Sequence, residues 1–160
     1  MGLASHFGPW RLGTVPNTTG TTAGTVRNMG ATVVAQKAAI AYTDAAPSTA
    51  FVLPAGATIL GISVFSTTAF TGTSPTIKVT IAGVDVTTAN AMTSGTAFNG
   101  SLAFAQTAGA AAVLANVGST DAFVTYTIGG SSLSAGAATL LVEYMVNLSD
   151  GTYNPTAYTA

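Results

Sequence analysis

Short runs of alternating apolar and polar residues recur along most of the chain, and turn-forming residues separate them. The clearest run covers residues 76–88. Its apolar positions Ile77, Val79 and Ile81 alternate with polar ones until the phase changes at Ala82-Gly83. Two alternating runs joined by a two-residue loop that contains Gly predict a tight β-hairpin.

The polar side of this hairpin carries Lys78 and Asp85, which we expect to lie close enough in the paired ladder to attract each other. An exposed ion pair of this kind contributes at most about 1 kcal/mol to stability. We therefore interpret the pair as an aid to strand register and not as part of an active site.

A period of two also marks residues 58–66, where Leu60, Ile62 and Val64 are predicted to share one face. Ile59, Ser63 and Phe65 are predicted to lie on the other face of that strand. Strands are likewise predicted at 121–128 and 138–147. The residues expected to share a face are Val124, Tyr126 and Ile128 in the former and Leu140, Val142, Tyr144 and Val146 in the latter, with Glu143 opposite.

Weaker strand patterns occupy residues 31–42 and 50–56, and a short strand is predicted near Phe98, Leu102 and Phe104. The Ala-rich residues 110–117 do not distinguish helix from strand. The sequence Gly129-Gly130-Ser131-Ser132 is expected to end the strand at 121–128, because Gly and Ser punctuate strands.

These patterns give seven or eight short strands within 160 residues, a length that predicts one domain. Thr and Val are abundant, and β-branched side chains pack well on a pleated sheet. The predicted fold class is all-β, an antiparallel β-sandwich or jelly-roll-like domain. We expect this domain at 31–150, an extended N-terminal arm at 1–30 and a C-terminal tail at 151–160.

Residues 1–30 differ from the rest because Gly, Thr and Asn dominate and little apolar periodicity is present. Such a segment cannot fold by itself. It is either a disordered tail or an arm that becomes ordered against a neighbouring subunit. The cluster Phe7-Gly8-Pro9-Trp10 favours the arm, because Trp is enriched at interfaces. The interface candidates are Phe7, Trp10, Arg11, Arg27, Tyr153 and Tyr158.

Charged residues make up only 6% of the chain, where an ordinary soluble domain has about 25%. The four Lys and Arg residues are scattered, so binding to nucleic acid through a basic patch is not expected. Absence of cysteine excludes disulfides and thiolate chemistry. The mean hydropathy is +0.52, but no apolar run approaches the roughly 20 residues that span a membrane. A surface with so little charge favours self-association.

Candidate catalytic groups are few. His6 is the single histidine and lies in the suspected arm, so no nucleophile–base pair is evident. The acidic residues are Asp44, Asp85, Asp121, Glu143 and Asp150. We interpret them as solvated or turn-capping, although one sequence leaves open a pairing of Glu143 with Asp121 across strands. No metal or phosphate motif is present. We expect no catalytic, cofactor-binding or metal residues, and no enzyme.

Two stretches, 51–59 and 67–77, carry a family resemblance. Leu53-Pro54-Ala55-Gly56-Ala57 precedes one strand and Thr73-Ser74-Pro75-Thr76-Ile77 begins another. These segments resemble small tailed-phage virion structural proteins, most of all capsid decoration or cement proteins. The resemblance implies a protein made in the host cytoplasm that binds the outside of an icosahedral head. It also implies the major capsid protein as partner, a homo-oligomer with a trimer favoured, and no catalytic residues.

Other roles fit the same composition. The runner-up is a tail or fibre component, which includes a glycan-binding module for host recognition. Such a module predicts an exposed groove lined by aromatic or carboxylate side chains. A tail tube or connector component is a further alternative, because composition does not distinguish it from a cement protein. A carbohydrate-cleaving enzyme requires two carboxylates in one cleft.

Overall fold

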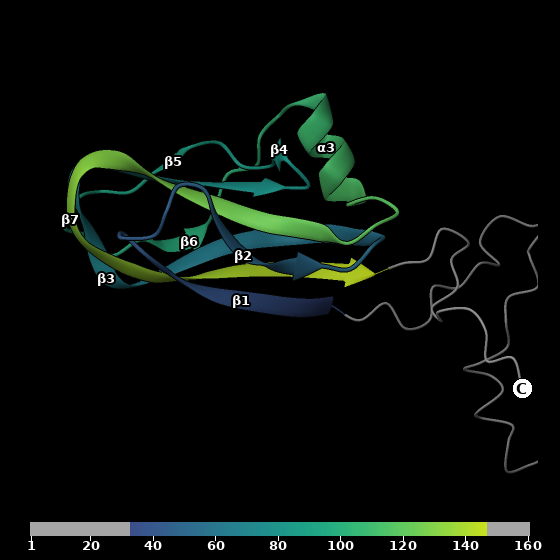
Figure 1. The fold of residues 1–160 in the computed structure, drawn as a ribbon, viewed down its shortest axis with the longest axis horizontal. Helices are drawn as coiled ribbons and strands as arrows, with labels where there is room; N and C mark the ends of the chain where they lie inside the picture. Colours follow the sequence, from purple (N-terminus) through teal and green to yellow (C-terminus); the bar gives the residue numbers. More distant parts are fainter. Residues whose placement is uncertain (1–32, 147–160) are drawn as a thin grey trace, which may run out of the picture. The chain divides into compact units, whose positions relative to one another are not determined.

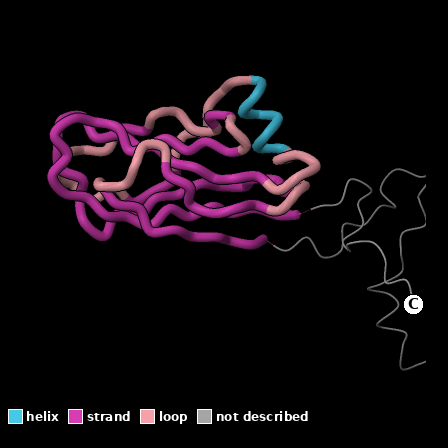
Figure 2. Tube along the Cα trace, in the orientation of Figure 1, coloured by secondary structure: helices cyan, strands magenta, loops and turns pink. Residues whose placement is uncertain are grey.

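The computed structural model describes residues 33–146, which form seven strands and one helix (Figures 1 and 2). Every strand pairing is antiparallel, and the all-β fold class predicted from the sequence is confirmed. The elements are β1 (Val33–Ala41), β2 (Ser48–Leu53), β3 (Ala57–Ile81), β4 (Val84–Asp85), β5 (Asn90–Ala91), β6 (Asn99–Ser101), α3 (Ala108–Ala115) and β7 (Ala122–Val146).

Two strands of 25 residues each, β3 and β7, form the framework. They pair along their whole length, from Ala57 opposite Val146 to Ile81 opposite Val124. The register shifts repeatedly between Ser66 and Thr76, near the middle of the ladder. Figure 1 shows both strands curving through a bend in this region. One long ribbon therefore folds over on itself, which is one way in which strands pass between the sheets of a sandwich.

The shorter strands extend the two halves of the ribbon into two layers. In layer 1, β1 pairs with the C-terminal half of β7, and β6 pairs with the N-terminal half of β3. In layer 2, β2 pairs with the N-terminal half of β7, while β4 and β5 pair with the C-terminal half of β3. The two halves of β3 and β7 thus belong to different layers of the sandwich.

The core lies between the layers and is built from every second residue of the long strands. This alternation follows from the pleat, which points successive side chains to opposite faces. The most deeply buried large side chains are Phe70, Leu53, Ile62, Ile77, Ile81, Leu140, Val64, Val79, Val86, Val124 and Val142. The predicted inward face of 121–128 is confirmed, since Val124, Tyr126 and Ile128 are all buried.

The bend is packed around Phe70, whose side chain is 1% exposed. Gly136 on β7 faces this ring so closely that a methyl group at Gly136 would overlap it. Gly136 also has a φ of 148°, a conformation that residues with a side chain rarely adopt. A glycine is therefore required here for both backbone and packing reasons.

Several predicted strands are confirmed, but two predicted interruptions are wrong. Residues 31–42 contain β1, residues 50–56 contain most of β2, and the hairpin between β3 and β4 turns at Ala82-Gly83. Gly129 to Ser132 do not end a strand, because β7 continues through them. The predicted strands at 58–66 and 76–82 are likewise parts of β3. Glycine and serine bend these strands without ending them.

One face assignment in β3 is wrong. Ile59 is buried and Leu60 is 44% exposed, whereas Leu60 was predicted to share a face with Ile62 and Val64. The pairing register shifts between Ile59 and Gly61, which places two residues of β3 opposite one residue of β7. Such a bulge reverses the alternation for the residues before it.

The undecided Ala-rich segment is helical, as α3. Thr107 is its N-cap, and its side-chain oxygen accepts a hydrogen bond from the amide of Ala110 at 3.1 Å. This bond satisfies a backbone donor that the first turn of a helix leaves free. Within residues 33–146, no helix is long and apolar enough to cross a membrane.

Candidate interaction surfaces

Large apolar side chains remain exposed on both outer faces of the sandwich. Val33, Leu60 and Phe65 are 58%, 44% and 45% exposed and belong to strands of layer 1. Val52 and Phe123 are 38% and 61% exposed and belong to strands of layer 2. Exposed apolar side chains mark a site of interaction where they gather on one face, so their neighbours on each face decide the interpretation.

Three neighbouring strands of layer 1, namely β1, β7 and β3, carry on their outer side what we call the layer 1 face, and the fourth strand, β6, borders it with the exposed polar residues Asn99 and Ser101. The register places Val33 opposite Met145, and Ala35 opposite Glu143, which in turn lies opposite Gly61. The residues of this face are Val33, Ala35 and Lys37 of β1, Leu141, Glu143 and Met145 of β7, and Thr58, Leu60, Ser63 and Phe65 of β3. Its composition is apolar or small except for one lysine and one glutamate.

The two charges of the layer 1 face sit on adjacent strands. Lys37 is opposite Leu141, so it is diagonal to Glu143 across the β1–β7 ladder. The Glu143 carboxylate extends over Gly61, where an added Cβ would lie 3.2 Å from Glu143 Oε2. No hydrogen bond or ion pair joins either side chain to another residue of the described range 33–146.

The outer side of layer 2 carries a smaller apolar site. Val52 of β2 lies directly opposite Phe123 of β7. Cross-strand pairs of this type are close enough to act as one surface. We call Val52 and Phe123 the layer 2 pair. Since the two faces point away from a shared core, the layer 2 pair and the layer 1 face lie on opposite sides of the sandwich.

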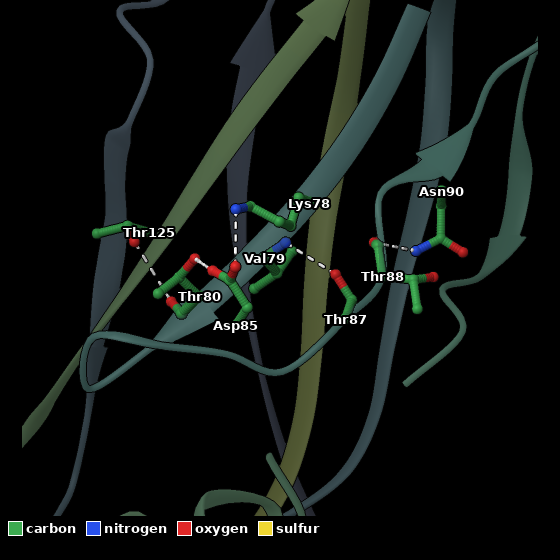
Figure 3. Close-up of polar contacts among 8 residues, drawn as sticks. All are labelled: Lys78, Val79, Thr80, Asp85, Thr87, Thr88, Asn90 and Thr125. Carbon is green, nitrogen blue, oxygen red and sulfur yellow. Dashed lines mark hydrogen bonds and ion pairs between the residues drawn. The ribbon is translucent and has the colours of Figure 1, made fainter. Parts of the chain in front are cut away.

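Polar contacts in the predicted hairpin serve the fold (Figure 3). Lys78 Nζ lies 2.8 Å from Asp85 Oδ2, and the Thr80 hydroxyl donates to Asp85 Oδ1 at 2.7 Å. The hydrogen bond from Lys78, assisted by that from Thr80, lowers the pKa of Asp85 below its ordinary value. The predicted ion pair is confirmed, and because both side chains are substantially exposed its contribution to stability is small.

A second polar contact lies inside the same hairpin. The Thr87 side chain is 1% exposed, and its hydroxyl oxygen accepts a hydrogen bond from the amide of Val79 at 2.8 Å. Figure 3 shows this bond beside the Lys78–Asp85 pair. A buried hydroxyl with a partner in the neighbouring strand helps to hold the hairpin in place.

Two further carboxylates also bind to their own chain. Asp44 Oδ2 accepts from the Tyr126 hydroxyl and from the amide of Ala41, both at 2.6 Å. Burial raises the pKa of Tyr126 to about 12, and the hydrogen bond to Asp44 adds to the effect. Asp121 Oδ1 accepts from the amide of Ala55 at 3.0 Å. These contacts brace the ends of strands.

The structure does not bring Asp121 and Glu143 into one site. Asp121 directly precedes the part of β7 that belongs to layer 2, whereas Glu143 lies in the part that belongs to layer 1. In the described residues no three His, Asp or Glu side chains gather as a metal site. The absence of catalytic function stays a prediction.

None of the predicted interface residues can be placed. Phe7, Trp10, Arg11, Arg27, Tyr153 and Tyr158 lie outside the described residues, as do His6, Asp150, the arm 1–30 and the tail 151–160. The sequence analysis did not single out the layer 1 face or the layer 2 pair. Phe65 carried a usable signal, because the period of two already placed it opposite Ile62 and Val64.

Neither a protein-family model nor a curated protein matches the chain. Two solved chains are similar in structure. One belongs to the capsid of Ralstonia phage GP4, with 20% identity, 75% of this chain and 88% of that chain covered, and a TM-score of 0.49. The other belongs to the cyanophage Pam1 capsid asymmetric unit, with 20% identity, coverage of 79% and 94%, and a TM-score of 0.44.

Both similar chains come from phage capsids. At TM-scores below 0.5 and 20% identity, neither alignment assigns a family or a function to this chain.

Proposed function

We propose that the chain is a structural protein of a tailed-phage virion. Its role is that of a capsid decoration or cement protein, which binds the exterior of the head and stabilises it as a homo-oligomer, with a trimer favoured. The protein has no catalytic activity and no cofactor. Its partners are other copies of itself and the major capsid protein.

The observation that carries this proposal is the pair of apolar sites on opposite sides of one sandwich. A cement protein needs one surface that joins copies to each other and another that contacts the capsid lattice. The layer 1 face is the larger of the two and suits the contact between copies. The layer 2 pair then remains on the opposite side, where it suits the capsid contact. Only 6% of the residues are charged, so little electrostatic repulsion opposes either association.

The acidic residues support a structural role. Asp44, Asp85 and Asp121 each accept hydrogen bonds from nearby groups of the chain. Acid–base catalysis needs a carboxylate that faces a substrate together with a second group. Glu143 is the remaining described carboxylate, and it lies on an open sheet face among apolar side chains.

Binding to heads provides the test. Purified chain is mixed with heads of the phage that encodes it, assembled without the chain, and bound protein is measured by sedimentation. We expect saturable binding and a higher temperature of head disruption. Phe123→Ser should weaken binding at least tenfold, because it removes the most exposed aromatic ring of layer 2.

The matched control is Thr49→Ser on β2, an exposed position that faces the same side. It should bind heads like the unchanged chain. Absence of saturable binding by the unchanged chain contradicts the capsid role, and equal binding by Phe123→Ser contradicts the assignment of the layer 2 pair.

A glycan-binding module in a tail or fibre is the second candidate, and one observation favours it. The ring of Phe123 is 61% exposed, and an exposed aromatic face can stack on a sugar ring. A glycan array probed with the full chain separates the two functions. Binding that is abolished by Phe123→Ala, together with no binding to heads, would favour host recognition.

A further inference from the structure

The layer 1 face lacks a cover among the described residues. Leu60 and Phe65 keep almost half of their surface exposed, and Val33 more than half. The helix α3 packs against β3 and β4 and leaves these three side chains exposed. We expect such an apolar sheet face, in a protein with little surface charge, to be covered by a binding partner of matching chemistry.

Glu143 defines the electrostatic character that the occupant must match. Asp85 is bound by Lys78, Asp44 by the Tyr126 hydroxyl, and Asp121 by the amide of Ala55. Glu143 is the one acidic residue in the range 33–146 without such a contact there, and it stands beside exposed Leu60. The occupant should offer a cation next to a large apolar side chain.

Residues 1–32 have this chemistry. They contain Arg11 and Arg27 and no acidic residue, whereas residues 33–146 contain two lysines and four acidic residues. The segment is therefore cationic and the sandwich anionic. Trp10, the single tryptophan of the chain, directly precedes Arg11 in the sequence. An adjacent Trp and Arg match an apolar face that holds one carboxylate, and both residue types are enriched where interfaces are strongest.

We propose that the N-terminal segment of one copy docks on the layer 1 face of a neighbouring copy, with Trp10 against Leu60 and Arg11 paired with Glu143. This inference rests on the proposed homo-oligomer and names its interface. Arg is suited to the pairing because its guanidinium can bind a carboxylate through two hydrogen bonds. Lys37 lies diagonal to Glu143, but no ion pair joins the two side chains in the structure.

The length of the segment allows it to reach a neighbouring copy as the acceptor. The segment joins the sandwich at Val33, which is itself on the layer 1 face. Neighbouring strands are about 4.8 Å apart, so Thr58 lies only about 10 Å from Val33 across the sheet, and Leu60 is two residues further along β3. More than twenty residues separate Trp10 from Val33, and an extended chain covers about 3.3 Å per residue. A connection this long suits the distance between copies.

Disulfide trapping tests the inference, and the absence of native cysteine makes it specific. Gly8→Cys is made in one preparation and Ala35→Cys in a second preparation that carries a larger tag. Neither substitution removes Trp10, Arg11, Leu60 or Glu143. After mixing and mild oxidation, we expect a reducible product whose mass is the sum of the two chains.

The control pairs Gly8→Cys with Thr49→Cys, an exposed position on the outer side of layer 2. It should give at least tenfold less product. Glu143→Arg should reduce trapping at Ala35→Cys about tenfold, and adding Arg11→Glu to the partner preparation should restore it. Equal trapping at both positions, or no rescue by the reversed charges, would overturn the inference. A Gly8→Cys/Ala35→Cys chain that closes only within itself would also overturn it.

These outcomes are separate from those of the head-binding assay. A chain that binds heads but gives no specific trapping leaves the cement function standing and removes the docking site. A chain that is trapped specifically but does not bind heads keeps the docking site and contradicts the capsid role.

Discussion

Tyr126 illustrates how a single side chain links the two parts of this fold. Its ring is buried in the core, and its hydroxyl donates to Asp44 in the connection between β1 and β2. Asp44 in turn accepts from the amide of Ala41 at the end of β1. One tyrosine of layer 2 therefore fixes the position at which the chain leaves layer 1.

Tyr126→Phe should lower the free energy of unfolding by about 1.5–3 kcal/mol at neutral pH, because a hydrogen bond to a charged group is lost. The unchanged protein should lose stability as pH rises from 10, where an unfolded tyrosine ionises, towards about 12, where the folded Tyr126 does. Between these two pH values the Tyr126 hydroxyl ionises in the unfolded state but not in the folded state. Rising pH therefore shifts the equilibrium towards the unfolded state.

Urea unfolding at pH 7 to 12 measures both effects, with Tyr42→Phe as control. The difference between the unchanged protein and Tyr126→Phe should shrink above pH 10, whereas the control should follow the unchanged protein. A constant difference up to pH 12 would exclude the assigned role of the Tyr126 hydroxyl.

At the scale of elements, the bend in β3 and β7 decides the architecture. A straight ribbon of two 25-residue strands would expose both of its faces. Folding at the bend lets the apolar faces of the two halves bury each other. Phe70 packs directly against Gly136 at the bend. Among the described glycines, a Cβ added at Gly136 would meet the closest neighbouring atom, which belongs to the Phe70 ring.

Gly136→Ala should therefore destabilise the protein by about 2–4 kcal/mol, through overlap with Phe70 and an unfavourable backbone conformation. Gly100→Ala is the control, because a Cβ at Gly100 meets no atom within 4 Å, and it should change stability by less than about 0.5 kcal/mol. Urea unfolding measures both variants. Equal stabilities would mean that the bend is not packed as described, and Phe70→Leu should recover part of the loss in Gly136→Ala.

The sequence predicted most of the strands because their apolar residues recur with a period of two. It could not predict their continuity, because Gly129 and Gly130 are equally compatible with a turn and with a bent strand. The face of Leu60 was also beyond reach, since a bulge depends on the pairing partner and not on local composition. The hairpin at Ala82-Gly83 was predictable, because its turn and its ion pair are both local.

The difference between features set by local sequence and features set by strand pairing also applies to the candidate site. The sequence placed Phe65 on the face opposite Ile62 and Val64, but it did not predict that Phe65 is exposed, since Ile59 was assigned to the same face and is buried. The layer 1 face required the register of three strands that are distant in the sequence, with Ala35, Glu143 and Gly61 side by side. A surface assembled from such contacts has no signature in any one segment.

The whole molecule combines an apolar outer face with very few charges. Such a protein is expected to be soluble as an assembly in which the layer 1 face is covered. The ends of the described range, Val33 and Val146, belong to paired strands on this same layer. Assembly through the layer 1 face is therefore the claim from which the proposed function and the docking of the N-terminal segment both follow.

Light scattering after gel filtration measures that claim directly, with the full chain at micromolar concentration. We expect a mass that is a multiple of 15.7 kDa, three-fold for the favoured trimer, and a shift to 15.7 kDa for Leu60→Ser/Phe65→Ser. The matched variant Thr49→Ser should keep the larger mass. A mass of 15.7 kDa for the unchanged chain would contradict assembly through the layer 1 face.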